Sequence, residues 1–261
     1  MAISTRRPAP FEEGLYLARF RQGRAGIEPV PGEVAQIDGL ASIYQALVTG
    51  VRDYIGKNRF AGAIVGLSGG VDSALTVAIA ADALGPERVH AVMMPSPYTS
   101  DMSLEDAREE AQALGVRYST LPIADTVAAI ERTLADEFRD SPRDTTEENI
   151  QARVRGVLLM ALSNKTGKLV LTTGNKTEMA VGYATLYGDM AGGFAVIKDV
   201  PKLLVYKLSR YRNSLSPVIP ERVLTRAPTA ELRPDQTDQD RGPPMSWVWE
   251  SGMMPRRLDN P

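Results

Sequence analysis

The chain has 261 residues, of which 43% are hydrophobic and 24% are charged, and its formal net charge is −2. This length is enough for one sizeable hydrophobic core with a short appendage. The nearly balanced charge argues against a nucleic-acid-binding or membrane-surface protein. Because there is no cysteine, disulfides, thiolate nucleophiles and cysteine-based metal centres are excluded.

The histidine content and the apolar runs set further limits. The single histidine, His90, lies in the apolar run 89–94, which predicts a strand and a structural role for the imidazole. No apolar stretch is long enough to cross a bilayer, and no apolar segment follows Arg6 and Arg7 as it would in a secretory signal. We therefore expect a cytoplasmic protein without membrane or nucleic-acid partners.

Three regions differ in pattern along the chain. Proline and glycine interrupt residues 1–38, which predicts a poorly structured linker or the remnant of an upstream domain. Residues 39–240 carry regular apolar periodicity and are the predicted domain. Residues 241–261 form an atypical tail that holds both tryptophans and shows no clear period.

Within the predicted domain, strands alternate with helices. A helix from Gly39 to about Gly56 comes first. We then expect strands at 63–67, 89–94, 116–121 and 169–172, and helices at 73–84, 103–114, 123–138 and 146–164. Ser103 and Thr146 are the candidate N-caps of the second and fourth of these helices, and Gly115 and Gly167 suit their ends.

This alternation predicts an α/β fold, a doubly wound parallel sheet with helices on both faces. Ligands of such sheets bind beyond the carboxyl ends of the strands. The loops after Leu67, Met94 and Thr172 are therefore the expected binding loops.

A glycine-rich loop, Gly66-Leu67-Ser68-Gly69-Gly70-Val71-Asp72-Ser73, joins the first of these strands to its helix. Its backbone N–H groups, its two serine hydroxyls and the positive end of the helix together suit a phosphate. Asp72 would repel a polyphosphate unless a cation such as Mg²⁺ lay between them. A plain glycine turn in which Asp72 caps the helix is the other interpretation.

The Ser-Gly-Gly-Val-Asp-Ser string resembles the signature of the ATP pyrophosphatase superfamily, whose loop grips the pyrophosphate that leaves when ATP adenylates a substrate. Four later segments, 147–153, 171–178, 182–189 and 227–232, resemble the glutamine-dependent NAD synthases in order and spacing. The resemblance covers roughly Tyr44 to Asp240. It implies an adenine nucleotide alpha hydrolase-like, Rossmann-like fold.

The resemblance also implies site residues and a reaction. ATP would contact Gly66, Leu67, Ser68, Gly69, Gly70, Val71, Asp72, Ser73, Thr173, Lys202 and Thr229. Deamido-NAD would contact Asn149, Arg153 and Glu178, Mg²⁺ would bind Asp72 and Glu178, and the catalytic set would be Asp72, Glu178 and Lys202. The nicotinate carboxylate would be adenylated by ATP with release of pyrophosphate, and ammonia would then displace AMP.

The chain departs from the family in two places. Leu186 stands where ammonia-dependent members carry a lysine, which favours the glutamine-dependent branch. Members of that branch carry a glutaminase domain with a catalytic cysteine, and this chain has no cysteine. We therefore expect a fragment that uses free ammonia or a separate glutaminase. The likeness stops near Gly242-Pro243-Pro244, so we expect the tail to be truncated or frameshifted.

The family resemblance implies a homodimer or larger homo-oligomer, with helix 146–164 as a candidate interface. Two other functions stay open from sequence alone. One is a degenerate nucleotide-binding or assembly module without turnover. The other is another ligase with the same loop, such as a GMP synthase.

Overall fold

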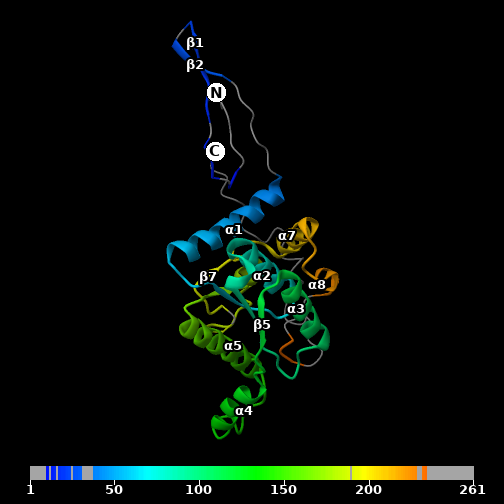
Figure 1. Cartoon of the computed structure of the whole chain (residues 1–261). Helices are drawn as coiled ribbons and strands as arrows, with labels where there is room; N and C mark the ends of the chain where they lie inside the picture. Colours follow the sequence, from blue (N-terminus) through cyan, green and yellow to red (C-terminus); the bar gives the residue numbers. More distant parts are fainter. Residues whose placement is uncertain are drawn as a thin grey trace.

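A computed structural model describes residues 10–11, 13–15, 17–24, 26–30, 38–188, 190–227 and 231–233 (Figure 1). In chain order the elements are β1 Phe20–Gly23, β2 Gly26–Pro29, α1 Gly39–Lys57, β3 Ala63–Gly66, α2 Val71–Leu84, the 3₁₀ turn η1 Pro86–Arg88, β4 Val89–Met93, α3 Asp101–Leu114, β5 Arg117–Thr120, α4 Ala124–Thr133, α5 Thr145–Thr166, β6 Leu169–Thr172, α6 Lys176–Val181, β7 Phe194–Ala195, α7 Lys202–Leu215 and α8 Glu221–Thr225.

The main sheet has five strands in the order β5-β4-β3-β6-β7, and every pairing in it is parallel. The chain builds outward from β3 through β4 to β5, then returns to the other side of β3 with β6 and β7. This reversal places a topological switch point between β3 and β6, where sheets of this kind open a crevice for ligands. The predicted doubly wound α/β fold is confirmed.

Alternating side chains of the strands feed two cores. In β3, Ala63 and Val65 join the core beneath α1, α2, α3, α7 and α8, whereas Ile64 joins the core beneath α4 and α5. Because successive side chains of a strand point to opposite faces, strands buried on both faces are largely apolar along their whole length. Figure 1 shows α1, α2 and α7 on one side of the sheet and α5 on the other.

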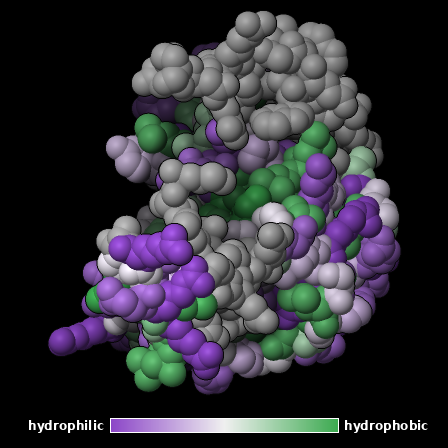
Figure 2. Space-filling view, turned by 90° about the horizontal axis from the view of Figure 1, so that it is seen from above, coloured by the Kyte–Doolittle hydropathy of each residue, from purple (hydrophilic) through white to green (hydrophobic). Residues whose placement is uncertain are grey.

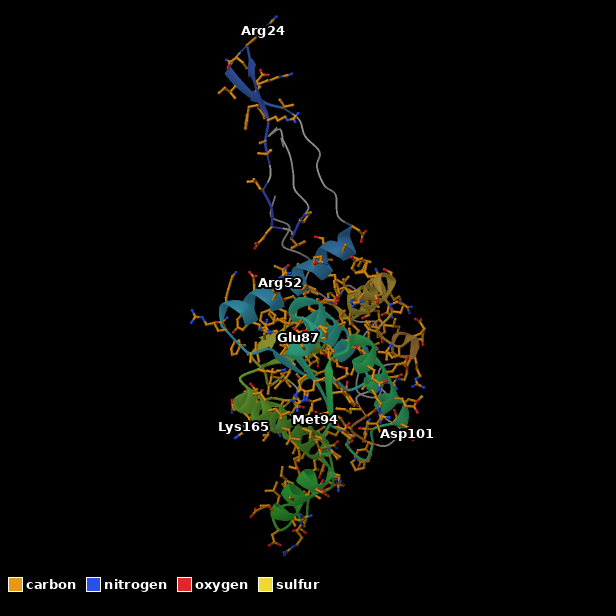
Figure 3. All side chains as sticks on the ribbon, in the orientation of Figure 1. Arg24, Arg52, Glu87, Met94, Asp101 and Lys165 are labelled. Atoms are coloured by element: carbon orange, nitrogen blue, oxygen red, sulfur yellow. The ribbon has the colours of Figure 1, made fainter. Side chains whose placement is uncertain are left out.

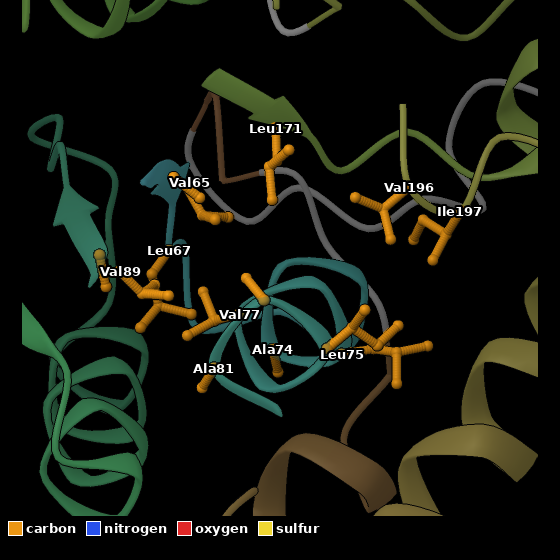
Figure 4. Packing of buried hydrophobic residues seen from close by; sticks show 14 of the residues in the cluster. Val65, Leu67, Ala74, Leu75, Val77, Ala81, Val89, Leu171, Val196 and Ile197 are labelled. Carbon is orange, nitrogen blue, oxygen red and sulfur yellow. The ribbon is translucent and has the colours of Figure 1, made fainter. Parts of the chain in front are cut away.

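Helix α2 lies in the middle of the larger core. In the close view of this packing, Val77 lies beside Leu67, which directly follows β3 (Figure 4). The helix is apolar on most of its circumference because α1 and α7 cover its other side. The loop before α2 is therefore held by a helix that is itself packed on most of its circumference.

A polar cluster ties the three helices of this face together. Tyr44 of α1 donates a hydrogen bond of 2.6 Å to Asp82 of α2. Arg212 of α7 donates two hydrogen bonds to the same carboxylate, at 2.7 and 3.0 Å. The cluster fixes the position of α7, whose first residue is Lys202.

Two predicted helix starts are wrong by a few residues. Ser100 caps α3 by accepting a hydrogen bond from the backbone N–H of Ser103, so Ser103 lies inside the first turn. Asp144 caps α5 with a capping box completed by Glu147, and Thr146 donates its N–H to that cap. In both cases an earlier polar side chain lies where the backbone is still extended or irregular, which is what an N-cap requires.

Other differences concern short elements. Residues 20–29 were predicted to lack structure but contain the hairpin of β1 and β2. The glycines that interrupt the apolar runs here, Gly23 and Gly26, lie at its turn. Helix α4 ends at Thr133 instead of Phe138, and the chain continues in single turns. Strand β7 and helices α7 and α8 had no sequence prediction.

The hairpin projects away from the domain. Arg24 marks its tip, far from Met94, which lies at the carboxyl end of β4 (Figure 3). Seen from above the view of Figure 1, the described surface mixes hydrophilic and hydrophobic residues (Figure 2). Among the described residues, no helix is long and apolar enough to cross a membrane.

Candidate active site

A cavity of about 280 Å³ opens at the switch point of the sheet. The loop 66–73 after β3, Met93 and Met94 at the end of β4, and residues 172–174 after β6 line it. The start of α7 contributes Lys202. The three loops expected to bind ligand therefore meet in one cavity, because the carboxyl ends of parallel strands share one edge of the sheet.

The loop 66–73 is held in shape by its own serines. Ser73 donates its hydroxyl to the carbonyl of Gly70 at 2.9 Å, and its oxygen accepts the backbone N–H of Ser68 at 3.2 Å. Gly70 is the N-cap of α2 and has no side chain to satisfy the first N–H groups of that helix. These N–H groups and the positive end of the helix form a site suited to an anion.

Gly69 has a specific steric role in this loop. Its φ of +80° lies in the left-handed region, and a Cβ atom placed there would lie 2.6 Å from the carbonyl oxygen of Ser103. Only glycine allows the loop to approach the start of α3 this closely. The guanidinium of Arg226 donates to the Gly69 carbonyl at 3.1 Å and to the Ser103 hydroxyl at 3.2 Å, which fastens the loop from the other side.

Asp72 and Lys202 form an ion pair within the cavity. Their side chains are only 16% and 10% exposed. Burial by itself would lower the pKa of Lys202, but the nearby carboxylates of Asp72 and Glu178 outweigh it and raise that pKa above its usual value. Lys202 is therefore a fixed cation between two acidic side chains beside the glycine-rich loop.

The first turn of α6 places Glu178. Asn175 is its N-cap and accepts the N–H groups of Thr177 and Glu178 at 2.9 and 3.1 Å, while Glu178 accepts the N–H of Asn175 at 2.9 Å. Asn175 also donates its side-chain amide to Asp72 at 2.9 Å. The two carboxylates predicted to act together are thus linked through one residue.

This arrangement fits a hard divalent cation. Among the described residues, no group of three or more histidine, cysteine, aspartate or glutamate side chains is placed to hold a metal by itself. Mg²⁺ is commonly held by one or two carboxylates together with phosphate oxygens and water. Asp72 and Glu178 both line the cavity and could supply such carboxylates, and the ammonium of Lys202 lies where both carboxylates favour positive charge.

Most predicted site residues meet in the cavity. Those that line it are Gly66, Leu67, Ser68, Gly69, Gly70, Val71, Asp72, Ser73, Thr173, Glu178 and Lys202. Thr229 lies outside the described residues.

Asn149 and Arg153 of α5 do not line the cavity. Asn149 accepts a hydrogen bond from the hydroxyl of Thr185 at 2.9 Å, and Arg153 donates to the carbonyl of Leu186 at 3.2 Å. The segment they hold leads to Gly188, which does line the cavity. The two residues therefore support a wall of the site from outside.

Several polar cavity residues were not predicted as site residues, among them Arg226, Ser103 and Arg155. Arg226 bonds both the glycine loop and Ser103, and Arg155 donates to the carbonyl of Met94 at 3.1 Å. Arg226 directly precedes a segment that carried the family resemblance, and Arg155 lies two residues after Arg153. Both arginines lay beside a recognised motif, but their roles depend on contacts that sequence spacing does not reveal.

The parallel sheet and the anion-binding loop at its switch point define an α/β protein of the adenine nucleotide alpha hydrolase-like fold. The sequence model of the NAD synthase family matches residues 43–245. The chain belongs to the NAD synthase family, as its motifs predicted.

Relatives support this assignment. The chain is 56% identical to a glutamine-dependent NAD(+) synthetase of Acinetobacter baylyi, over 89% of this chain and 43% of the relative. It is also 56% identical to the enzyme of the same name from Thermotoga maritima, over 77% of this chain and 35% of that relative. The chain thus spans less than half of the length of these curated relatives.

Solved structures show the same fold. A glutamine-dependent NAD+ synthetase from Acinetobacter baumannii, in complex with adenosine diphosphate, has a TM-score of 0.79 and 55% identity, over 84% of this chain and 42% of that chain. NMN synthetase from Francisella tularensis has a TM-score of 0.73 and 26% identity, over 83% of this chain and 87% of that chain.

Proposed function

We propose that this chain catalyses the ATP-dependent amidation of deamido-NAD to NAD. The observation that carries the proposal is the cavity in which the glycine-rich loop, Asp72 and Lys202 meet at the switch point. Membership of the NAD synthase family supports the choice of substrate. The adenosine diphosphate bound to the relative from Acinetobacter baumannii supports the choice of nucleotide.

The reaction has two steps. A carboxylate oxygen on the nicotinate ring attacks the α-phosphorus of ATP. The bond from that phosphorus to the oxygen shared with the β-phosphorus breaks, and pyrophosphate leaves with this oxygen. Ammonia then attacks the acyl carbon, AMP leaves with the oxygen that joined it to that carbon, and the nitrogen loses a proton to form the amide. Positioning and charge stabilisation are the main tasks of the protein in such phosphoryl chemistry.

Residues of the cavity serve these tasks. The N–H groups of the loop 66–73 bind the phosphates, and the ammonium of Lys202 neutralises charge that develops on departing pyrophosphate. Mg²⁺, held by Asp72 and Glu178 when bound, would neutralise phosphate oxygens. Thr173 and Thr229 contact ATP. Glu178 and the α5 residues Asn149 and Arg153 lie on the side of the site where deamido-NAD binds.

The nitrogen donor is ammonia, either free or released from glutamine by a separate glutaminase. The active form is a homodimer or larger homo-oligomer that pairs through α5. Val157 and Met160 of α5 and the adjoining Leu186 and Tyr187 support this interface, because all four side chains are exposed although they are apolar.

A single assay tests the function. The protein is incubated with ATP, Mg²⁺, ammonium and deamido-NAD, and NAD and AMP are measured together, while sedimentation of the same sample reports the oligomer. Asp72→Asn keeps the size of the side chain and removes its charge, so we expect it to lower turnover by about 100-fold or more. Asp53→Ala, an exposed acidic residue of α1, is the matched control and should leave turnover unchanged.

Other outcomes would assign the chain elsewhere. ATP binding without AMP or NAD indicates a module without turnover. AMP formation only in the presence of xanthylate indicates a GMP synthase. Wild-type turnover in folded Asp72→Asn would overturn the role of this carboxylate.

A further inference from the structure

Asn175 joins the two predicted metal-binding carboxylates, Asp72 and Glu178, through hydrogen bonds to each of them. Its side chain is 0% exposed, and Asn175 does not line the cavity. It cannot touch a ligand in the cavity directly, so any effect on the reaction must act through its neighbours.

The side-chain amide of Asn175 has two separate functions. Its oxygen caps α6 by accepting the N–H groups of Thr177 and Glu178. Its nitrogen donates to one carboxylate oxygen of Asp72, and the other oxygen of Asp72 faces Lys202. Aspartate would keep the cap but, when ionised, has no hydrogen to donate, and serine is too short to span the same two partners.

The backbone around Asn175 extends this control to the other catalytic residues. Its N–H donates to Glu178 at 2.9 Å. Thr177 accepts the N–H of Lys202 at 3.0 Å, and Lys176 donates its N–H to the carbonyl of Val200 at 3.0 Å. One turn of backbone thus carries Glu178, orients Asp72 and anchors the start of α7.

We propose that Asn175 is a positioning residue that orients Asp72 and Glu178 for the magnesium complex of ATP. This inference rests on the proposed function, because it concerns the same site. The amide nitrogen engages one oxygen of Asp72 and leaves the other directed at the position now held by the Lys202 ammonium. The spacing of the two carboxylates follows from the geometry of a single N-cap.

Asn175→Ser separates the two functions, because serine is also a good N-cap but lacks the reach to Asp72. Hydrogen-bond partners that orient metal ligands commonly account for about 10- to 100-fold in metal affinity or activity. We therefore expect Mg²⁺-supported ATP affinity, measured by titration calorimetry, to fall by about this factor. ATP affinity in EDTA should change little, and the Mg²⁺ concentration for half-maximal NAD formation should rise.

Helix capping must be separated from positioning. Asn175→Ala removes both functions, and Asp38→Ala removes the N-cap of α1, a helix whose cap contacts no predicted site residue. Asp38→Ala should lower the denaturation temperature but leave the Mg²⁺ dependence of ATP binding unchanged. Equal effects of Asp38→Ala and Asn175→Ser on that dependence would overturn the proposal.

The binding measurement also separates this inference from the proposed function. If wild-type protein makes no NAD but binds ATP more tightly with Mg²⁺, and Asn175→Ser loses that gain, the function fails and the positioning role stands. If the gain from Mg²⁺ is the same in wild type and folded Asn175→Ser, the positioning role fails, whatever product is made. If Mg²⁺ gives wild type no gain, the positioning role fails as well.

Discussion

Gly69 is the residue at which the phosphate loop depends most on backbone conformation. We expect Gly69→Ala to destabilise the fold by about 1–3 kcal/mol, because alanine is strained at a positive φ and its Cβ would lie 2.6 Å from the Ser103 carbonyl oxygen. ATP binding should weaken with it, because relief of the clash moves the loop. Urea unfolding and ATP titration measure the two effects.

Gly70 is the natural control because it is the next residue of the same loop. Its φ is −94°, and a Cβ there would meet the Ser68 hydroxyl oxygen at 3.5 Å, an ordinary contact. Gly70→Ala should therefore cost at most about 1 kcal/mol, the usual effect of alanine at an N-cap. Equal losses of stability in the two variants would show that the strain at Gly69 is not the cause.

At the residue scale, the sequence predicts what is local. The eight residues of the loop could be identified because their spacing, their glycines and the following helix all lie within one short segment. Their partners lie elsewhere: Asn175 reaches Asp72 across 103 positions, and Arg226 reaches Gly69 across 157. No local pattern distinguishes these side chains from ordinary polar ones.

At the element scale, buried strands were predicted within about two residues, because a short unbroken apolar run between turns is typical of a strand buried on both faces. Helix starts were less accurate, since Ser100 and Ser103 are both acceptable caps and only the backbone decides between them. Strand β7 has two residues, which is too short for any periodicity. Its position follows from pairing with β6 instead.

Arg226, at the end of α8, joins three elements through one guanidinium. It bonds the phosphate loop and α3, and it lies 4.0 Å from the buried carboxylate of Asp106. We expect Arg226→Ala to weaken ATP affinity by about 10-fold, the scale of a lost hydrogen bond from a charged donor. Arg226→Lys should recover only part of this, because an ammonium cannot reproduce the planar fork of arginine.

Titration with ATP and thermal denaturation of each variant check this prediction. Arg132→Ala, on the exposed surface of α4, is the control for loss of a positive charge. Asp106 keeps Arg222 as a partner in every variant, so the fold should persist. Unchanged ATP affinity in folded Arg226→Ala would mean that the contact with Gly69 does not stabilise the binding conformation.

For the whole molecule, the parallel sheet and the location of the site followed from the alternation of helices and strands. The relation between Asn149 and the cavity did not, because it depends on how residues 185–188 pack on α5. Gly156 allows that packing: a Cβ at this position would lie 2.9 Å from the carbonyl oxygen of Gly188. Such contacts between distant segments appear only when the chain is folded.

Stability of the whole domain should depend on pH through His90, which is buried in β4 and hydrogen-bonds with Ser119 at 2.8 Å. Burial, followed by the positive charges of Arg117 and Lys168, lowers the pKa of His90 from 6.5 to about 4. Between these values the unfolded chain binds a proton that the folded chain does not. Stability should therefore fall as pH drops from 6.5 toward 4, by about 2–3 kcal/mol in total, and His90→Gln should remove this loss.

Glu110 should act in the opposite direction. Its side chain is 0% exposed and neither carboxyl oxygen has a hydrogen-bond partner; burial, with Asp106 adding to it, raises the pKa of Glu110 well above 4.5. The contribution of protonated Glu110 to stability is complete below pH 4.5. It is lost as pH rises toward the pKa of the folded state, because only the unfolded chain releases the proton in this range. Glu110→Gln should therefore be more stable than wild type at neutral pH. Urea unfolding from pH 4 to 8 gives both slopes, and variants that run parallel to wild type throughout would contradict the burial of these charges as the cause.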